Sequence, residues 1–102
     1  MIIVEKNEGA KIPFEEFGTK VCFDDDLTIN LAKREEDEPV HIHVCHDADN
    51  NLVIGSAAGR MYVAEIDIPA RTYHEEGEGE EKALVADPLD MEKVKLTLWA
   101  IE

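Results

Sequence analysis

One short segment of the sequence gathers most of the histidine and cysteine side chains, which are the best candidates for binding a transition-metal ion. Residues 41–46 read HIHVCH and contain three of the four histidines of the chain. On a β-strand, alternate side chains point to the same face, so His41, His43 and Cys45 would project together. Imidazole and thiolate groups are common ligands of zinc and other transition metals. The pattern indicates a metal site that His46, Asp47 or His74 would complete.

The same alternation also has a purely structural interpretation. Val40, Ile42 and Val44 occupy the positions between the polar residues of this segment, as on a strand with one buried face. The histidines would then be ordinary polar residues of the exposed face. Spacing alone does not establish the ligand geometry that a metal requires, so we favour the structural interpretation for this segment.

Residues 41–46 resemble two known metal-binding motifs. The pattern is similar to the His-x-His-x-Asp-His motif of metallo-β-lactamase-type hydrolases, but Cys45 stands in place of the Asp, and the chain is too short for their αββα fold. A His-x-His pair on a strand is also similar to the metal site of cupins. The Glu expected a few residues later is missing here, and only Asp47 and His74 could take the remaining roles. Neither resemblance assigns a family.

The segments around this cluster alternate with a period of two, which is typical of strands. The pattern predicts a mainly β fold, a small antiparallel sandwich or barrel of about seven or eight short strands with at most one or two helical turns. We expect residues 1–102 to form a single acidic domain. The predicted strands are residues 2–6, 20–23, 27–32, 40–45, 52–54, 60–68 (extending to 74), 83–86 and 94–98.

Three segments rich in Asp, Asn or Gly are predicted to connect the strands. Residues 47–51 (DADNN) begin like a calcium loop but lack its later Gly and Glu, so we interpret them as a hairpin turn. Residues 55–59 (GSAAG) lack the Lys of a phosphate loop and are interpreted as a tight connection or bulge. Residues 75–81 (EEGEGEE) are interpreted as a Gly/Glu loop.

The charge of the chain is strongly one-sided. Its 24 acidic residues outnumber 10 Lys and Arg, which gives a formal net charge of -14. Such a field repels nucleic-acid phosphates and anionic membranes and attracts basic protein surfaces. In size and charge the chain resembles the DNA-mimic anti-restriction and anti-CRISPR inhibitors of phages and mobile elements. The alternative is that charged strand ends only prevent edge-to-edge association.

The side chains expected to bind a partner lie in three acidic runs, with one aromatic residue near the C-terminus. Trp99 falls on the face opposite Val94, Leu96 and Leu98, which suggests a partner surface, a homodimer patch or a second covering layer. Tyr62 is expected to share a face with Ala64, and Tyr73 to lie on the opposite face of the same long strand. The expected partner-binding residues are Asp24, Asp25, Asp26, Glu35, Glu36, Asp37, Glu38, Glu75, Glu76, Glu78, Glu80, Glu81 and Trp99.

These patterns together predict a non-enzymatic acidic interaction protein, since no nucleophile elbow, phosphate loop or dinucleotide fingerprint is present. The expected partner is a basic surface, in the narrowest version that of a nucleic-acid-binding protein. The alternatives are a metal-binding domain using His41, His43, Cys45 and His46 with zinc or another transition metal, and a structural component of a phage-like assembly. The N-terminal residues show no signal peptide, so we expect a cytoplasmic protein with Cys22 and Cys45 reduced.

Overall fold

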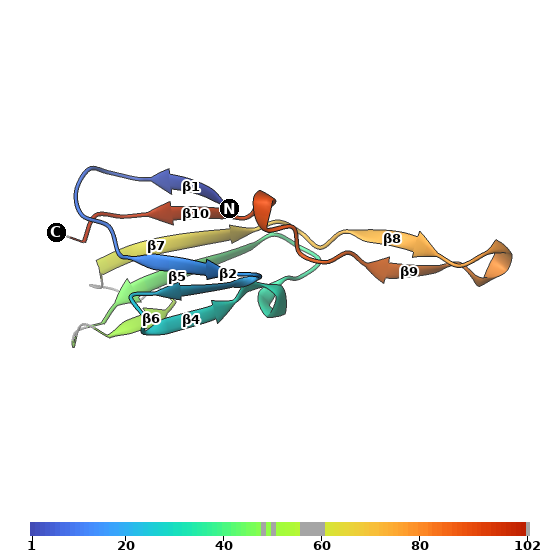
Figure 1. The fold of residues 1–102 in the computed structure, drawn as a ribbon, viewed down its shortest axis with the longest axis horizontal. Helices are drawn as coiled ribbons and strands as arrows, with labels where there is room; N and C mark the ends of the chain where they lie inside the picture. Colours follow the sequence, from blue (N-terminus) through green and yellow to red (C-terminus); the bar gives the residue numbers. More distant parts are fainter. Residues whose placement is uncertain (48, 50, 56–60, 102) are drawn as a thin grey trace.

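The computed structural model of the chain describes residues 1–47, 49, 51–55 and 61–101. Within these residues it contains ten strands and three single 3-10 turns (Figure 1). The strands are β1 (Ile2–Glu5), β2 (Phe14–Phe17), β3 (Lys20–Phe23), β4 (Leu27–Asn30), β5 (Val40–His46), β6 (Leu52–Ile54), β7 (Met61–Ile68), β8 (Tyr73–Glu76), β9 (Ala83–Ala86) and β10 (Lys95–Leu98). The turns are η1 (Leu31–Arg34), η2 (Gly79–Glu81) and η3 (Met91–Lys93).

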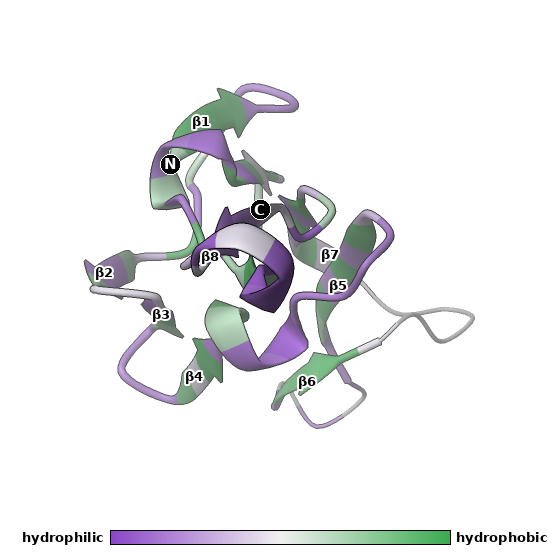
Figure 2. Ribbon diagram, turned by 90° about the vertical axis from the view of Figure 1, so that its right-hand side faces the viewer, coloured by the Kyte–Doolittle hydropathy of each residue, from purple (hydrophilic) through white to green (hydrophobic). Residues whose placement is uncertain are grey.

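The strands form three sheets, which confirms the prediction of a mainly β fold. A five-stranded sheet has the order β1-β10-β7-β5-β6, a three-stranded sheet the order β2-β3-β4, and β8 pairs with β9 alone. All pairs are antiparallel except β1 and β10, which run parallel. The two larger sheets pack face to face, as the view in Figure 2 shows. The described residues therefore form an open sandwich.

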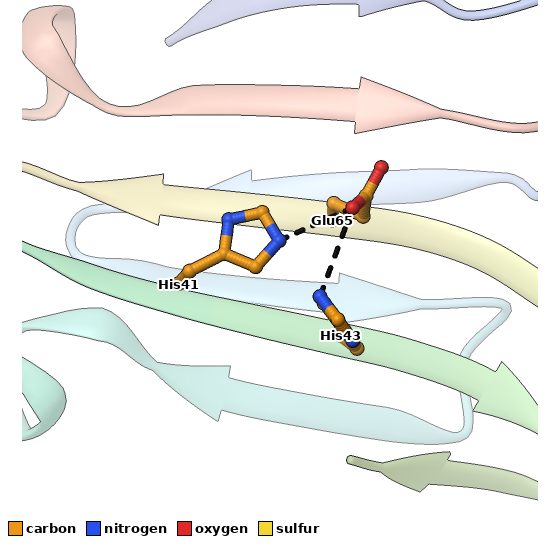
Figure 3. A group of neighbouring side chains, drawn as sticks. All are labelled: His41, His43 and Glu65. Carbon is orange, nitrogen blue, oxygen red and sulfur yellow. Dashed lines mark hydrogen bonds and ion pairs between the residues drawn. The ribbon is translucent and has the colours of Figure 1, made fainter. Parts of the chain in front are cut away.

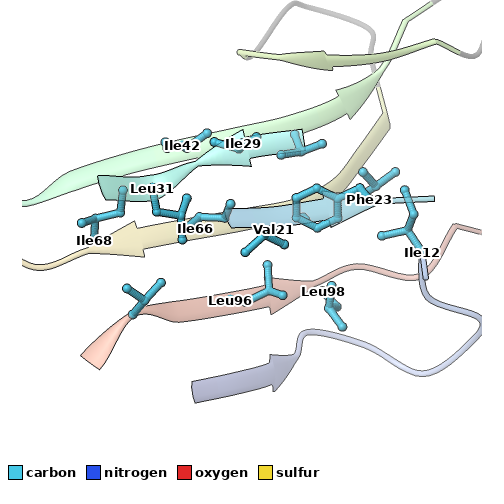
Figure 4. Packing of buried hydrophobic residues seen from close by; sticks show 14 residues of the cluster. Ile12, Val21, Phe23, Ile29, Leu31, Ile42, Ile66, Ile68, Leu96 and Leu98 are labelled. Carbon is cyan, nitrogen blue, oxygen red and sulfur yellow. The ribbon is translucent and has the colours of Figure 1, made fainter. Parts of the chain in front are cut away.

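The core lies between the two larger sheets (Figure 4). The three-stranded sheet contributes Val21, Phe23 and Ile29, and the five-stranded sheet contributes Ile66 and Leu96 among others, all almost fully buried. The core residues of each strand occupy alternate positions, as Val21 and Phe23 do in β3 and Leu96 and Leu98 in β10, so one face of each sheet is apolar. Burying one such side chain stabilises the fold by about 1.5–3 kcal/mol.

The strand predicted at residues 27–32 ends earlier in the structure. β4 stops at Asn30, whose side chain accepts a hydrogen bond from the backbone N–H of Ala32 at 3.2 Å. This contact caps η1, and Leu31 still reaches the core from the first position of that turn. The local side-chain bond therefore replaces the last part of the predicted strand.

The long strand predicted at residues 60–74 is wrong in two respects. β7 ends at Ile68, and after Pro69 the chain leaves the sandwich, so Tyr73 belongs to a different sheet. Within β7 the register shifts: Val44 pairs with Ala64 but Cys45 pairs with Tyr62, which leaves Val63 as an extra residue. Such a bulge reverses the alternation of side chains. Tyr62 therefore leaves the face of Ala64 and lies exposed on the outer face of the sheet.

Strands β8 and β9 project from the sandwich as a two-stranded ribbon, which we call the arm (residues 73–86) (Figure 1). Because of the arm the molecule measures 58 × 23 × 22 Å along its principal axes. Val85 is half-buried, and every other residue of the arm is exposed. The arm therefore contributes no residue to the core.

Candidate functional site

The outer face of the five-stranded sheet carries a compact cluster of His41, His43 and Glu65. The two histidines alternate along β5, and the register of β5 with β7 places Glu65 opposite His43 and Asp67 opposite His41. Oε1 of Glu65 lies 3.1 Å from Nε2 of His41 and 3.7 Å from Nε2 of His43 (Figure 3). The ligand atoms of the three residues all lie within 4.8 Å of one another.

Two further side chains hold this cluster in place. Nδ1 of His41 forms a short hydrogen bond with Oδ1 of Asp67. Nε1 of Trp99 donates to Oε2 of Glu65 at 2.8 Å, so the other oxygen of that carboxylate faces the histidines. The hydrogen bond with Asp67 raises the pKa of His41; burial opposes it, and Glu65 adds a smaller increase.

Aromatic rings continue the cluster across the sheet. The rings of His41 and His43 meet edge to face at 4.6 Å, and those of His43 and Tyr62 at 5.2 Å. The rings of Tyr62 and Trp99 lie 6.1 Å apart, and the ammonium of Lys6 lies 5.7 Å from the Trp99 ring. Trp99 thus lies on the outer face, as expected from its position in the sequence, but much of its surface is engaged within the chain.

The structure does not bring Cys45 and His46 to the other predicted metal ligands. The Cys45 side chain is buried, and its Sγ lies 3.1 Å from the carbonyl oxygen of Gly55, to which it donates. His46 lies at the end of β5, opposite Leu52. No disulfide joins the two cysteines of the chain.

The carboxylate of the cluster, Glu65, comes from another strand, and sequence reasoning missed it. It lies far from the histidines in sequence, and only the pairing register of β5 with β7 places it beside them.

All three loop segments interpreted from sequence fall wholly or partly within the described chain. Asp47–Asn51 connects the antiparallel strands β5 and β6, as predicted for a hairpin, and Oδ1 of Asp47 accepts from the backbone N–H groups of Asp49 and Asn51 at 2.9 Å. The glycine-rich segment lies outside the described residues, apart from Gly55.

The first acidic run, Asp24 to Asp26, forms the turn between β3 and β4. It is fully exposed and lies at the end of the sandwich opposite the arm (Figure 1). Asp24 and Asp25 both have a φ of 52°. Asp is among the few residues that adopt this left-handed conformation readily, so the turn itself accounts for part of this run.

The second acidic run, Glu35 to Glu38, lies at the base of the arm and is only partly free in solvent. Nη2 of Arg71 donates to the carbonyl of Glu35 at 2.7 Å, and its Nε lies 3.5 Å from the carboxylate of the same residue. The hydroxyl of Tyr73 donates to Asp37. Glu35 and Asp37 therefore anchor the arm, although Asp37, like Glu36 and Glu38, is exposed.

The third acidic run occupies the outer half of the arm. All five of its carboxylates are exposed: Glu75, Glu76, Glu78, Glu80 and Glu81. Near the base, His74 lies between two carboxylates, with Nε2 2.8 Å from Glu76 and Nδ1 2.6 Å from Asp87. Glu76 and then Asp87 raise the pKa of His74. Thr72 donates to Asp87 at 2.6 Å, and this bond, followed by that of His74, lowers the pKa of Asp87.

Comparisons with models of protein families, with curated proteins and with solved structures find no match for this chain. In the described part of the chain, no helix has the length and apolar character needed to cross a membrane.

Proposed function

We propose that the protein is a non-enzymatic interaction protein whose acidic arm binds a basic surface of a partner protein. The observation that carries this proposal is the arm itself. A two-stranded ribbon extends away from the sandwich, adds no residue to the core, and carries five glutamates and one lysine.

The arm is not expected to stabilise the fold. An isolated two-stranded hairpin is at best marginally stable in water, because it buries little apolar surface against the entropy of ordering its backbone. Three hydrogen bonds hold the base of the arm here. The hydroxyl of Tyr73 donates to Asp37, the hydroxyl of Thr72 donates to Asp87, and the guanidinium of Arg71 donates to the carbonyl of Glu35. These contacts orient a projection that does not stabilise the sandwich in return.

The chemistry of the arm favours a basic partner. Lys82, which lies 4.0 Å from Glu75, is the one lysine beside the five glutamates of the arm, and His74 contacts Glu76 at 2.8 Å. Leu84 is 71% exposed and pairs with Glu75 across the ribbon, so an apolar side chain stands among the charges. Interfaces commonly combine a desolvated apolar contact with a charged rim, and the charges also increase the rate of encounter.

In the narrower form of the proposal, the partner is a nucleic-acid-binding protein and the carboxylates take the place of phosphates. This is supported by the spread of the acidic runs along the 58 Å axis, at the far end of the sandwich, at the arm base and on the arm. An inhibitor of the kind used by phages or mobile elements would act in this way. Competition by duplex DNA for the same partner distinguishes this form from a general acidic docking element.

The proposal is tested by capture of proteins from a lysate of the source organism at low and high salt. The full chain is compared with an arm variant in which Glu75, Glu76, Glu78, Glu80 and Glu81 are changed to Gln. A matched control removes five exposed charges outside the three acidic runs: Glu5→Gln, Glu8→Gln, Glu15→Gln, Glu16→Gln and Glu92→Gln.

We expect a basic protein, identified by mass spectrometry, to be retained at low salt by the full chain and by the control. It should be lost with the arm variant and released by high salt. Retention of the same proteins by the arm variant and the full chain would contradict the proposal, as would retention that salt does not change.

A further inference from the structure

The cluster on the outer face of the five-stranded sheet lies on different elements from the arm and has a chemistry of its own. We propose that His41, His43 and Glu65 form a binding site for a divalent transition-metal ion, with zinc as the best fit. Two imidazole nitrogens and one carboxylate oxygen are a ligand set of open zinc sites, in which water or a further ligand takes the fourth position.

The distances in the cluster suit such an ion. In a tetrahedral zinc site with bonds of about 2.0–2.2 Å, neighbouring ligand atoms lie roughly 3.4 Å apart. Oε1 of Glu65 lies 3.1 Å and 3.7 Å from the two Nε2 atoms, and all three ligand atoms fall within 4.8 Å. These separations are close to the tetrahedral value, and side-chain rotations that shorten the longest of them would bring the three atoms to one ion.

The contacts behind the ligands point to the same conclusion. A metal-bound histidine usually donates its other ring N–H to a carboxylate, and a metal-bound carboxylate is usually hydrogen-bonded at its other oxygen. His41 has Asp67 in the first role, and Glu65 has Trp99 in the second. A hydrogen bond between His41 and Glu65 would by itself explain why these two side chains lie together. It gives no reason for Nε2 of His43 to face the same atom, Oε1 of Glu65.

An ion has access to this site from solvent. The side chain of His41 is 43% exposed and that of His43 is 29% exposed, while Glu65 lies deeper at 22%. The edge-to-face contacts of His43 with His41 and Tyr62 restrict its ring. The protein thus supplies three ligands from two rigid strands and leaves the outward position open.

The test is calorimetric titration of the full chain with ZnCl₂, after removal of metal by a chelator and in the presence of excess Mg²⁺ to occupy sites made only of carboxylates. We expect one zinc ion per chain. Each of the variants His41→Ala, His43→Ala and Glu65→Gln should weaken binding at least tenfold. His46→Ala and His74→Ala are the matched histidine controls and should leave the affinity unchanged.

Two further readouts separate a lost ligand from a lost fold. Asp67→Asn should weaken zinc binding about tenfold through His41 while the circular dichroism spectrum stays unchanged. Trp99 is the one tryptophan of the chain and touches Glu65, so Co²⁺ should quench its fluorescence in the full chain and not in Glu65→Gln.

Absence of stoichiometric zinc binding would overturn this proposal, and so would equal affinity of the full chain and Glu65→Gln. Neither result would affect the proposal for the arm, because the arm and the cluster share no residue.

Discussion

Removal of the arm tests whether β8 and β9 serve the sandwich or a partner. The backbone N–H of Asp87 donates to the carbonyl of Thr72 at 2.8 Å, so the chain is already in hairpin register where the arm begins. Residues 73–86 can therefore be replaced by Asn-Gly, the dipeptide preferred in two-residue type I′ turns.

The structure sets the size of the expected effect. The deletion removes no core residue, and Val85 is the most buried residue that it takes away. The hydrogen bond of Tyr73 to Asp37 and the exposed contact of His74 with Asp87 are lost, and a hydrogen bond such as the first contributes about 0.5–1.5 kcal/mol. The deletion also shortens the connection between Thr72 and Asp87, and each halving of the length of a loop lowers the entropic cost of closing it by about 0.6 kcal/mol. This gain offsets part of the stability lost with the hydrogen bonds. We expect the free energy of unfolding to change by no more than about 1 kcal/mol.

Urea denaturation followed by the fluorescence of Trp99, which lies in the sandwich, measures this change. Ile66→Ala is the reference for a true core loss, because Ile66 is fully buried and such truncations cost about 2–5 kcal/mol. If removal of the arm costs as much as Ile66→Ala, the arm belongs to the folding unit, and the argument that it exists for a partner fails.

Three further predictions concern the arm and the core. Leu96→Ala, in the core, should lower the free energy of unfolding by about 2–5 kcal/mol in urea denaturation, whereas Leu84→Ala, on the arm, should change it by less than about 0.5 kcal/mol and weaken partner capture. His74 has a raised pKa in the folded protein, so its contacts stabilise the arm base fully below pH 6.5, and this contribution is lost as pH rises through the pKa of the folded state. Asp87 has a lowered pKa in the folded protein, so its contacts stabilise the arm base fully above pH 3.8, and this contribution is lost as pH falls through the pKa of the folded state. Hydrogen exchange at the arm base should therefore be slowest, relative to a His74→Gln variant, between these two pH values, and a difference that does not vary with pH would contradict this. Gly77→Ala should speed exchange at the arm tip and leave the sandwich unchanged, because Gly77 has a φ of 109° and an added Cβ would lie 2.6 Å from a backbone oxygen across the tip.

The sequence predicted those parts of the fold that depend on local alternation. Ile42 and Val44, and likewise Leu96 and Leu98, are buried as their spacing indicated. The period of two is a local property of a strand, so it can be seen without knowledge of the partner strand.

Features set by pairing between distant segments were missed. Nothing near Val63 marks it as the extra residue of a bulge, yet that bulge moves Tyr62 to the outer face. The parallel pairing of β1 with β10 joins the two ends of the chain and leaves no local signal. Glu75 and Glu76 were expected in a loop because Glu is uncommon in strands, but they pair with residues of β9.

The same distinction applies to the candidate sites. The two histidines were predictable as a pair because they alternate on one strand, whereas the position of Glu65 follows from the register of β5 with β7. The three acidic runs could be recognised in the sequence, but the different structural surroundings of their side chains could not. Asp24 and Asp25 shape a turn, Glu35 and Asp37 anchor the arm, and the glutamates of the arm remain exposed.

The central claim is that the arm carries the binding of a basic partner. Its most direct test is the affinity of the captured basic protein for the full chain, the arm variant and the charge-matched control, measured by calorimetry over a series of salt concentrations. We predict at least tenfold weaker binding of the arm variant at low salt, a difference that shrinks as salt rises, and no loss with the control. Equal affinity of the arm variant and the full chain at low salt would contradict the claim.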